Sequence, residues 1–312
     1  MTKFDKYDEI KNAICGYGYD VGEYREIPYG LQFTIVFKGS QFNIRVYESS
    51  KKGITVDYSQ VKNHKVKKAI EDMLVGKYEN TGYELYKSDN SDLPLIGTDE
   101  SGKGDYFGAL CVSGVYGDKT VKKKLSALGV KDCKKLNDYE VVSLAQQIRK
   151  IDGLIHYTLQ LYPSELNELT INKNANMNTV LALLHLNVIN QIANESNCKL
   201  CLIDQFADDS LILDLNAKQF NIPIEIEQRP KAESNIIVAA ASILARNSFL
   251  ESINELSNRV NMSLPTGCGS NVIEKGTRLV EKQGVTSIID CGKVIFKDTT
   301  KTILQNKALV IL

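Results

Sequence analysis

The sequence LPLIGTDESGKGDYFGAL, residues 93–110, decides the fold of the larger part of this chain. Its apolar beginning predicts a short buried strand, because glycine and serine end the apolar run within the usual length of a strand. Asp99 and Glu100 follow at the carboxyl end of that strand. Neighbouring side chains on a regular strand point to opposite faces, so we expect these acids to share a site only if the chain turns there. Gly102 and Gly104 would permit that turn.

The glycine-rich turn leads into a second predicted strand, GALCVSGVY, at residues 108–116. A phosphate-binding loop of the Walker or Rossmann kind must instead lead into a helix whose N-terminus faces the phosphate. The chain also contains no Gly-Lys-Ser or Gly-Lys-Thr sequence. We therefore exclude nucleotide binding of that kind.

The composition is that of a soluble globular protein, with 312 residues, of which 43% are hydrophobic and 24% are charged. The 38 basic and 38 acidic residues give a formal net charge of zero, so a nucleic acid would have to be bound by local patches. No apolar run reaches the roughly 18 residues of a membrane span, and the charged N-terminus is unlike a signal peptide. We therefore expect a cytoplasmic protein that does not bind membranes.

The seven cysteines are odd in number and scattered, which favours reduced, buried thiols over a disulfide framework. Cys198 and Cys201 form a single CxxC pair. This pair leads into a strand-like sequence instead of a helix, and no second pair follows at a zinc-site spacing, so core thiols are favoured over redox or metal chemistry. His156 lies in a strand pattern and His185 in an apolar helix, and we expect both to be structural.

Residues 1–85 predict a small α+β domain. The expected elements are an amphipathic helix, three antiparallel strands and a second amphipathic helix, at residues 3–17, 31–37, 41–47, 54–59 and 66–74. A polar segment at residues 86–92 is the predicted linker. The second domain then spans residues 93–312.

The second domain is predicted to be α/β, with a mixed sheet and flanking helices. Its first two strands are joined by a short turn, whereas the later strands alternate with helices as in parallel crossover units. The later strands are expected at residues 154–162, 200–204 and 222–228, and the helices at 137–151, 180–194 and from Glu233 past Leu250. Beyond Leu264 we expect a helix near residues 273–283 and assign no state to the last apolar segments.

Four acids stand at matching places in this predicted sheet. Asp99, Glu100 and Asp204 end strands, and Glu233 begins the helix after the next strand. Ligands gather outside the carboxyl ends of strands in open sheets, and carboxylates brought together there repel one another unless a cation is bound. Oxygen ligands without nearby His or Cys favour Mg²⁺ or Mn²⁺ over zinc, and two such ions about 4 Å apart suit phosphodiester hydrolysis. Exposed turn acids are the alternative, which four coordinated positions disfavour.

Four stretches of the sequence resemble motifs of the type 2 ribonucleases H: GTDESGKGDYFG, GVKDCKKLND, IDQF and RPKAESNIIVAAASILAR. Together with the separate N-terminal unit, the chain most resembles ribonuclease HIII, whose N-terminal domain is similar to a TATA-box-binding-protein fold and helps to hold substrate. The resemblance implies a ribonuclease H-like catalytic domain that hydrolyses the RNA strand of RNA/DNA hybrids with Mg²⁺ or Mn²⁺. It also implies 5′-phosphate and 3′-hydroxyl product ends.

The resemblance also implies roles for individual acids. Asp99, Glu100 and Asp204 would bind metal, and Glu233 would be the fourth acid, positioning metal or product. Asp208 is a second candidate for the fourth acid if the chain turns helical after Asp204.

The same resemblance implies a set of substrate contacts. The turn formed by Gly102, Lys103 and Gly104 would approach the sugar edge of the RNA strand, because glycine lets backbone groups come close to a 2′-hydroxyl. Lys134 and Lys135 would contact phosphates. The alternative for these lysines is a solvated helix face, since seven lysines fall between residues 118 and 136.

The sequence departs from the family motifs at Cys133, where Ser is usual, and at Cys268, where Ala is usual. Neither position is an acid, so these departures concern substrate contacts and not the chemistry. Two other functions stay open: incision at single ribonucleotides in duplex DNA, as by ribonuclease HII, and hybrid binding without turnover. We expect the protein to be a monomer.

Overall fold

The structure is a computed structural model that describes residues 2–17, 19–37, 40–61, 64–76, 93–130 and 136–310. It forms two compact units, Met1–Ser91 and Asp92–Leu312, and each is described by itself. The predicted linker at residues 86–92 lies outside the described residues.

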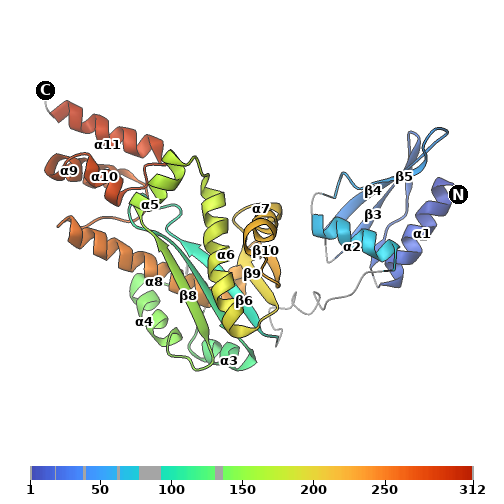
Figure 1. Ribbon diagram of the computed structural model, residues 1–312, viewed down its shortest axis with the longest axis horizontal. Helices are drawn as coiled ribbons and strands as arrows, with labels where there is room; N and C mark the ends of the chain where they lie inside the picture. The colour runs from blue at the N-terminus through green and yellow to red at the C-terminus, as the bar shows by residue number, and fades with distance from the viewer. Residues whose placement is uncertain are drawn as a thin grey trace. The chain divides into compact units, whose positions relative to one another are not determined.

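The first unit is a small α+β structure of two helices and an antiparallel sheet (Figure 1). Its elements are α1 (Lys3–Gly16), β1 (Asp20–Val21), β2 (Arg25–Ile27), β3 (Gly30–Phe37), β4 (Ser40–Ser49), β5 (Gly53–Asp57) and α2 (His64–Leu74). The predicted helices and the three-stranded meander are confirmed. Two short strands, β1 and β2, also pair with β3, and they were not predicted because two or three residues carry no alternating pattern.

The hydrophobic core of the first unit lies on one face of this sheet. Ile10 of α1 and Ile70 of α2 pack there with alternate residues of β3 and β4, such as Phe33 and Ile44. The side chains that alternate with these core residues are polar: Gln32, Thr34, Asn43 and Arg45. The sheet therefore has one face buried under helices and one polar face.

The second unit contains a five-stranded mixed sheet in the order β10-β9-β6-β7-β8. The strands are β6 (Leu95–Ser101), β7 (Leu110–Gly117), β8 (Ile155–Leu161), β9 (Leu200–Asp204) and β10 (Glu225–Arg229). β6, β7 and β8 are antiparallel neighbours, whereas β9 runs parallel to β6 and β10 runs parallel to β9. The predicted antiparallel beginning and parallel continuation are confirmed.

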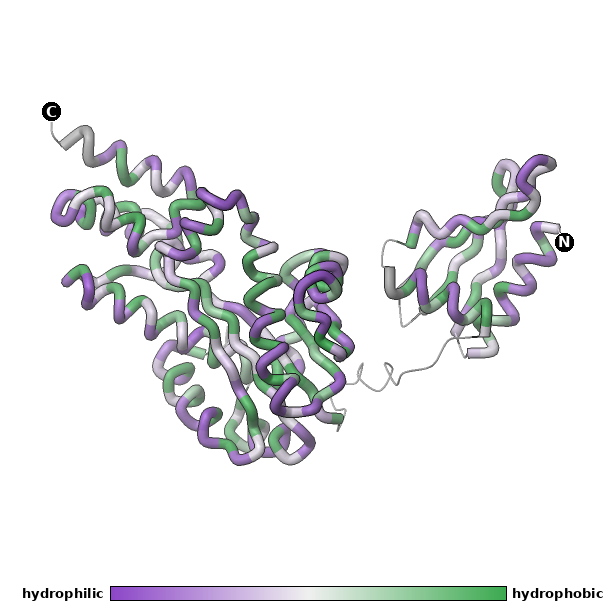
Figure 2. Tube along the Cα trace, viewed as in Figure 1, coloured by the Kyte–Doolittle hydropathy of each residue, from purple (hydrophilic) through white to green (hydrophobic). Residues whose placement is uncertain are grey.

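Helices cover both faces of this sheet. The helices of this unit are α3 (Lys119–Ala127), α4 (Asp138–Ile148), α5 (Pro163–Asn167), α6 (Met177–Ser196), α7 (Asp209–Leu215), α8 (Ile236–Arg259), α9 (Ser270–Gln283), α10 (Thr286–Cys291) and α11 (Lys297–Val310). α6 lies on one face, and α8 lies on the other together with α3 and α4 (Figure 1). Figure 2 shows hydrophobic residues along the strands between these layers and polar residues on the outer helices. Asn137 caps α4 in a capping box with Glu140, as predicted.

α8 is the central helix of the unit. Most of its residues are buried, and its alanine-rich first half allows close packing on β6 and β7. Among the described residues it is the one helix long and apolar enough to cross a membrane, but 78% of its apolar window is buried inside the protein. The burial identifies α8 as a core helix of this fold.

The prediction of reduced, buried thiols is confirmed only in part. No disulfide joins the described cysteines, and Cys198 and Cys201 are buried separately in the core, as predicted. Cys15 and Cys268, however, are exposed, so the expectation of buried thiols is wrong at these two positions. Cys133 lies outside the described residues.

Candidate active site

The sheet register brings two of the predicted acids together. Thr98 of β6 pairs with Ile203 of β9, and the two strands are parallel. Asp99 and Asp204 each follow one residue later, so they lie side by side at the carboxyl ends of adjacent strands. This is the edge where open α/β sheets place their ligands.

β6 stays regular through both of its acids, which corrects the prediction that the chain turns there. The strand extends to Ser101, and Asp99 still pairs with Ser113 of β7. The two acids therefore point to opposite faces: Asp99 toward α8, where the Ser242 hydroxyl binds it, and Glu100 toward α6. Both acids still line one pocket, because this pocket lies at the end of β6 and extends to both faces of the strand.

This pocket has a volume of roughly 500 Å³. It is lined by Asp99, Glu100, Ser101, Gly102, Lys103, Gly104, Leu136, Asp138, Val141, Asp204, Ser242 and Arg246. Three of the four predicted acids and the whole predicted glycine turn are thus in one place.

Asp99 is the most buried of these acids, with 8% of its surface exposed. Burial, and after it the negative charges of Glu100 and Asp204, raise the pKa of its carboxyl to about 8, although hydrogen bonds from Ser242 and the Glu100 backbone N–H lower it. The N–H donates to Asp99 Oδ1 at 2.8 Å. The site therefore has an excess of negative charge that a bound cation would relieve.

Glu100 has the opposite electrostatic balance. Burial tends to raise the pKa of its carboxyl, but His185 and Lys103 outweigh that effect and the pKa is lowered. His185 Nε2 lies 3.4 Å from Oε2, and Lys103 Nζ lies 3.7 Å from Oε1. Glu100 is thus held as a carboxylate by a different group on each oxygen.

Glu233 lies beside this site but does not line the pocket. It belongs to a 3₁₀ turn, Ala232–Ser234, and α8 begins only after Asn235, whose side chain caps the helix. The prediction that Glu233 begins α8 is therefore wrong by one turn. The same 3₁₀ turn holds the neighbouring acid, because the Ala232 N–H donates to Asp204 Oδ1 at 2.8 Å.

Asp208 does not join the acids of the pocket. The chain is not helical between Asp204 and Asp208, and Asp208 is the N-cap of α7, accepting a hydrogen bond from the Ser210 N–H at 2.9 Å. The hydrogen bonds from Ser210 lower the pKa of its carboxyl. Asp208 therefore has a capping role, and its candidacy as the fourth acid finds no support in the geometry.

The glycine turn contains two different kinds of glycine. Gly102 has φ +88°, and a Cβ atom there would lie 2.2 Å from the Ala109 carbonyl oxygen, so only glycine fits. Gly104 has no such strain, and a Cβ atom there would meet no atom within 4 Å. Gly102 thus makes the turn, whereas Gly104 leaves the backbone open to an incoming molecule.

Several site residues were not predicted from the sequence. Arg246 of α8 lines the pocket, and its guanidinium lies 3.1 Å from Oδ1 of Asp138, an acid that also lines the pocket. His185 was predicted to be structural, yet it contacts Glu100. The motif ASILAR did contain Arg246, but nothing in its spacing marked which face of the helix it occupies. Lys134 and Lys135 lie outside the described residues.

The pocket fits a divalent cation in its donor chemistry. Its acids supply hard oxygen ligands, and the pKa of Asp99 is raised first by burial and then by the charges of Glu100 and Asp204, both of which a bound cation would offset. In the described parts of the chain, no three His, Cys, Asp or Glu side chains already surround one point.

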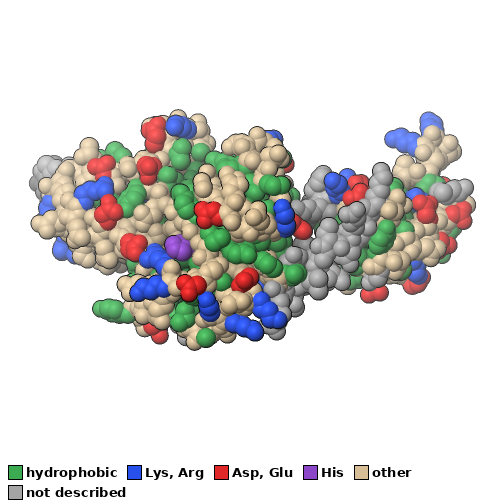
Figure 3. Space-filling view, turned by 60° about the horizontal axis from the view of Figure 1, so that its bottom comes forward, with side chains coloured by type: hydrophobic (Ala, Val, Ile, Leu, Met, Phe, Trp, Pro, Cys, Tyr) green, Lys and Arg blue, Asp and Glu red, His purple; other side chains and the backbone are tan. Residues whose placement is uncertain are grey.

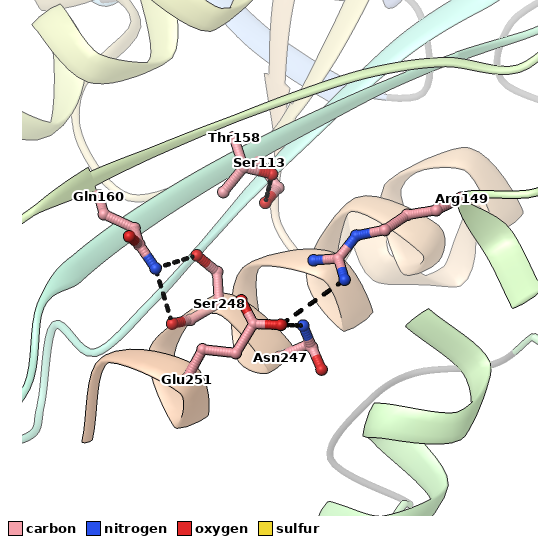
Figure 4. A network of polar contacts seen from close by, with 7 residues as sticks. All are labelled: Ser113, Arg149, Thr158, Gln160, Asn247, Ser248 and Glu251. Atoms are coloured by element: carbon pink, nitrogen blue, oxygen red, sulfur yellow. Dashed lines mark hydrogen bonds and ion pairs between the residues drawn. The ribbon is translucent and has the colours of Figure 1, made fainter. Parts of the chain in front are cut away.

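A second polar cluster lies where β8 meets α8 (Figure 4). Gln160 Nε2 donates to the Ser248 carbonyl and hydroxyl oxygens at 3.0 and 2.8 Å. Asn247 donates to Glu251 Oε1 at 2.7 Å, and Arg149 lies 3.6 Å from the same oxygen. These groups satisfy one another, so the cluster fastens the helix to the sheet and we assign no ligand to it.

One face of the second unit is mixed in charge. Figure 3 shows acidic and basic side chains interspersed over the face in view, without a continuous area of either sign. This agrees with the formal net charge of zero. Lys103 and Arg246 are cations at the pocket that a polyanion could contact.

Comparison with known proteins points to one family. Residues 96–299 match the family described as Ribonuclease HII. A ribonuclease HIII of Protochlamydia amoebophila is 38% identical over 204 residues, which cover 65% of this chain and 66% of the relative. A ribonuclease HIII of Chlamydia felis is 40% identical over 207 residues, covering 65% of this chain and 68% of that protein. The matches thus span about two thirds of these relatives' own length.

Solved structures agree with the sequence relatives. The crystal structure of Bst-RNase HIII in complex with Mn²⁺ is similar with a TM-score of 0.66 and 25% identity, covering 95% of each chain. The crystal structure of a mutant form of Bst-RNase HIII has the same TM-score and identity and covers 91% of this chain and 88% of that one. The likeness to these structures therefore extends over almost the whole chain.

Proposed function

Because the chain belongs to the ribonuclease HII family and has ribonuclease HIII proteins among its relatives, we propose that it hydrolyses the RNA strand of RNA/DNA hybrids. The proposed reaction is endonucleolytic, depends on two Mg²⁺ or Mn²⁺ ions, and leaves 5′-phosphate and 3′-hydroxyl ends. The observation that supports it most is the register of β6 and β9, with Asp99 and Asp204 beside Glu100 at one pocket next to a glycine turn.

In this proposal Asp99, Glu100 and Asp204 hold the metal ions, and Glu233 acts from the neighbouring turn. The bound ions would activate the attacking water and stabilise the leaving oxygen. The residues of the chain prepare the site for them: the Ala232 N–H fixes one Asp204 oxygen, and Ser242 binds Asp99. Fixed carboxylates lose less entropy when they bind an ion.

Substrate would reach the same pocket from the side of the glycine turn. Gly104 leaves its backbone open, which suits a close approach to the 2′-hydroxyl that distinguishes RNA from DNA. Lys103 and Arg246 at the pocket, with Lys134 and Lys135 on the preceding lysine-rich stretch, would contact phosphates. Such contacts give binding that is independent of sequence and weakens with salt.

The test is cleavage of a long RNA/DNA hybrid by the purified chain with Mg²⁺ or Mn²⁺. We expect cleavage by the wild type, and a loss of about three orders of magnitude or more for Asp99→Asn and Asp204→Asn, as for groups that act in the transition state. Asp208→Asn is the matched control, because this acid caps α7 outside the pocket, and its rate should stay unchanged. A wild type that binds hybrid but cleaves it in neither metal would leave only the hybrid-binding alternative.

Incision at a single ribonucleotide in duplex DNA is the other activity to separate. A duplex with one embedded ribonucleotide should be cut much more slowly than a long hybrid. Similar rates on both substrates would favour the ribonuclease HII-like activity over the one proposed here.

For the first unit we propose a substrate-holding role. Support comes from its polar sheet face, where Arg45 Nε donates to Gln32 Oε1 at 3.0 Å and Thr34 donates to Asn43 at 3.2 Å, an array of groups suited to sugar and phosphate contacts. The predicted likeness to a TATA-box-binding-protein fold is consistent with that use. Removing residues 1–85, or the single change Arg45→Ala, should raise the Kd for hybrid while Mn²⁺ binding stays unchanged. An unchanged Kd would assign the unit another role.

A further inference from the structure

His185 occupies an unusual position for a core histidine. It lies on α6 with no exposed surface, between a threonine of the sheet and an acid of the pocket. Its Nδ1 is 2.9 Å from Thr98 Oγ1, and its Nε2 is 3.4 Å from Glu100 Oε2. Within the described part of the chain, Nε2 makes no hydrogen bond of ordinary geometry, and its printed contact is the one with Glu100 Oε2.

The imidazole ring is fixed in this orientation. Phe206, from the loop after β9, stacks on it with 4.8 Å between ring centroids and 11° between the planes. Thr98 holds the opposite edge through Nδ1. Because one partner fixes the plane and the other fixes the rotation within it, Nε2 cannot turn away from Glu100 without losing both contacts.

The hydrogen-bond roles follow from these partners. The Thr98 hydroxyl can donate to Nδ1, which leaves the ring hydrogen on Nε2, facing the carboxylate. The other neutral tautomer would direct the Nε2 lone pair at Glu100 Oε2 and is disfavoured by repulsion. A ring with hydrogens on both nitrogens would also present an N–H to Glu100.

We propose that His185 is a positioning residue that holds the Glu100 carboxylate in the orientation in which it binds metal. The inference rests on the proposed metal site. His185 holds Oε2 while Lys103 lies 3.7 Å from Oε1, so the two oxygens are oriented from opposite sides. A glutamate has three rotatable side-chain bonds, and fixing the group in advance lowers the entropy lost when it ligates an ion. His185 itself lies behind the carboxylate and does not line the pocket.

The experiment measures Mn²⁺ binding to the full chain by calorimetry, without nucleic acid, after removal of bound metal. His185→Leu should weaken Mn²⁺ binding about 10-fold, the lower end of what loss of an outer-sphere partner costs. His185→Gln retains a donor near the Nε2 position and should recover most of the affinity. Thr98→Val leaves the ring but removes the group that directs its hydrogen, and should give an intermediate loss.

Two further variants serve as references. His156→Leu is the matched control, because His156 lies exposed on β8, and it should bind Mn²⁺ like the wild type. Glu100→Gln removes the ligand itself and should weaken binding more than any His185 variant.

The outcomes separate this inference from the proposed function. If Glu100→Gln weakens binding but a folded His185→Leu does not, the positioning role is wrong and the metal site stands. If Glu100→Gln also binds Mn²⁺ normally, the metal assignment of Glu100 fails. Should His185→Leu not fold, equal Mn²⁺ affinities of Thr98→Val, His185→Gln and the wild type would overturn the role. In hybrid cleavage at a fixed Mn²⁺ concentration, the His185 variants should lower kcat and leave KM unchanged.

Discussion

Asp99 and Lys293 are two buried charged side chains close to the same loop, and their surroundings differ. Burial raises the pKa of Asp99 to about 8 and lowers that of Lys293 to about 8. Lys293 has no exposed surface, and its Nζ donates to the carbonyl oxygens of Asp105 and Phe107 at 2.9 and 3.2 Å. Its partners are fixed backbone groups, whereas the neighbours of Asp99 include two more carboxylates.

The difference shows that burial alone does not mark a functional group. Lys293 is satisfied inside the protein, so its role is structural. Asp99 is buried beside two other carboxylates, and in the proposed function a bound cation offsets their charge. The identity of the partners, and not the size of the pKa shift, separates the two.

Lys293 also shows what keeps the glycine turn in place. Its backbone N–H donates to the Tyr106 carbonyl at 2.8 Å, so this one residue binds three successive carbonyls. From the loop before α9, Gly267 donates to Asp105 Oδ1 at 2.6 Å and accepts from the Tyr106 N–H at 2.8 Å. The loops before α9 and between α10 and α11 thus brace the segment that follows the glycine turn.

The largest expected change comes from neutralising Asp99 in the metal-free protein. The folded state keeps the Asp99 proton up to about pH 8, while the unfolded state loses it near pH 4, so stability falls as the pH rises between these values. Asp99→Asn removes this loss of stability, which amounts to about 1.4 kcal/mol for each unit by which the pKa differs between the folded and unfolded states. The variant should therefore gain Tm over the wild type at pH 8.5 in a chelating buffer, and much less at pH 4.5.

The matched control for that measurement is Asp208→Asn. Hydrogen bonds from Ser210 lower the pKa of Asp208, so its carboxylate stabilises the folded state above the unfolded pKa. Its replacement should not raise Tm at pH 8.5. An equal Tm gain at both pH values for Asp99→Asn would mean that the pKa of Asp99 is not raised in the folded protein.

The second change is Lys293→Met, which keeps the length of the side chain and removes its donors. Two buried carbonyl oxygens then lose their partner, and we expect a loss of about 2 kcal/mol in the free energy of unfolding at pH 7. Urea denaturation measures it, with Lys297→Met, an exposed lysine at the start of α11, as the control. A more stable Lys293→Met protein would mean that burying the Lys293 charge costs more than its hydrogen bonds to the two carbonyl oxygens contribute. The contrast between Lys293, which is satisfied, and Asp99, which lies beside other carboxylates, would then be wrong.

Local patterns in the sequence predicted the parts of the fold that depend on local interactions. The alternation of β3 and β4, the capping box of α4 and the apolar runs of β6 and β9 are complete within a few residues of each element. The carboxyl-end rule then placed Asp99 beside Asp204, although these residues are far apart in the chain.

The remaining features depend on contacts that no local pattern encodes. His185 meets Glu100, and Lys293 meets Asp105, only because α6 and the C-terminal segment fold back onto β6 and its turn. The sequence predicts no state for the segments of α10 and α11, because short apolar runs fit strand and helix equally well. The turn expected at Glu100 was wrong for a geometric reason. Asp99 and Glu100 point to opposite faces of β6, but the pocket at the end of the strand is lined by both.

The smallest expected change tests the open side of the turn. Gly104→Ala should alter the free energy of unfolding by less than about 0.5 kcal/mol, because the added methyl group meets no atom within 4 Å and relieves no positive φ. If substrate approaches this backbone, the same methyl group should still raise the KM for hybrid several-fold with kcat little changed. Urea denaturation and steady-state cleavage measure the two quantities. A Gly104→Ala protein with unchanged KM would place the sugar contact elsewhere on the turn, and Gly102, whose φ of +88° makes it structural, would then be the one glycine that the turn requires.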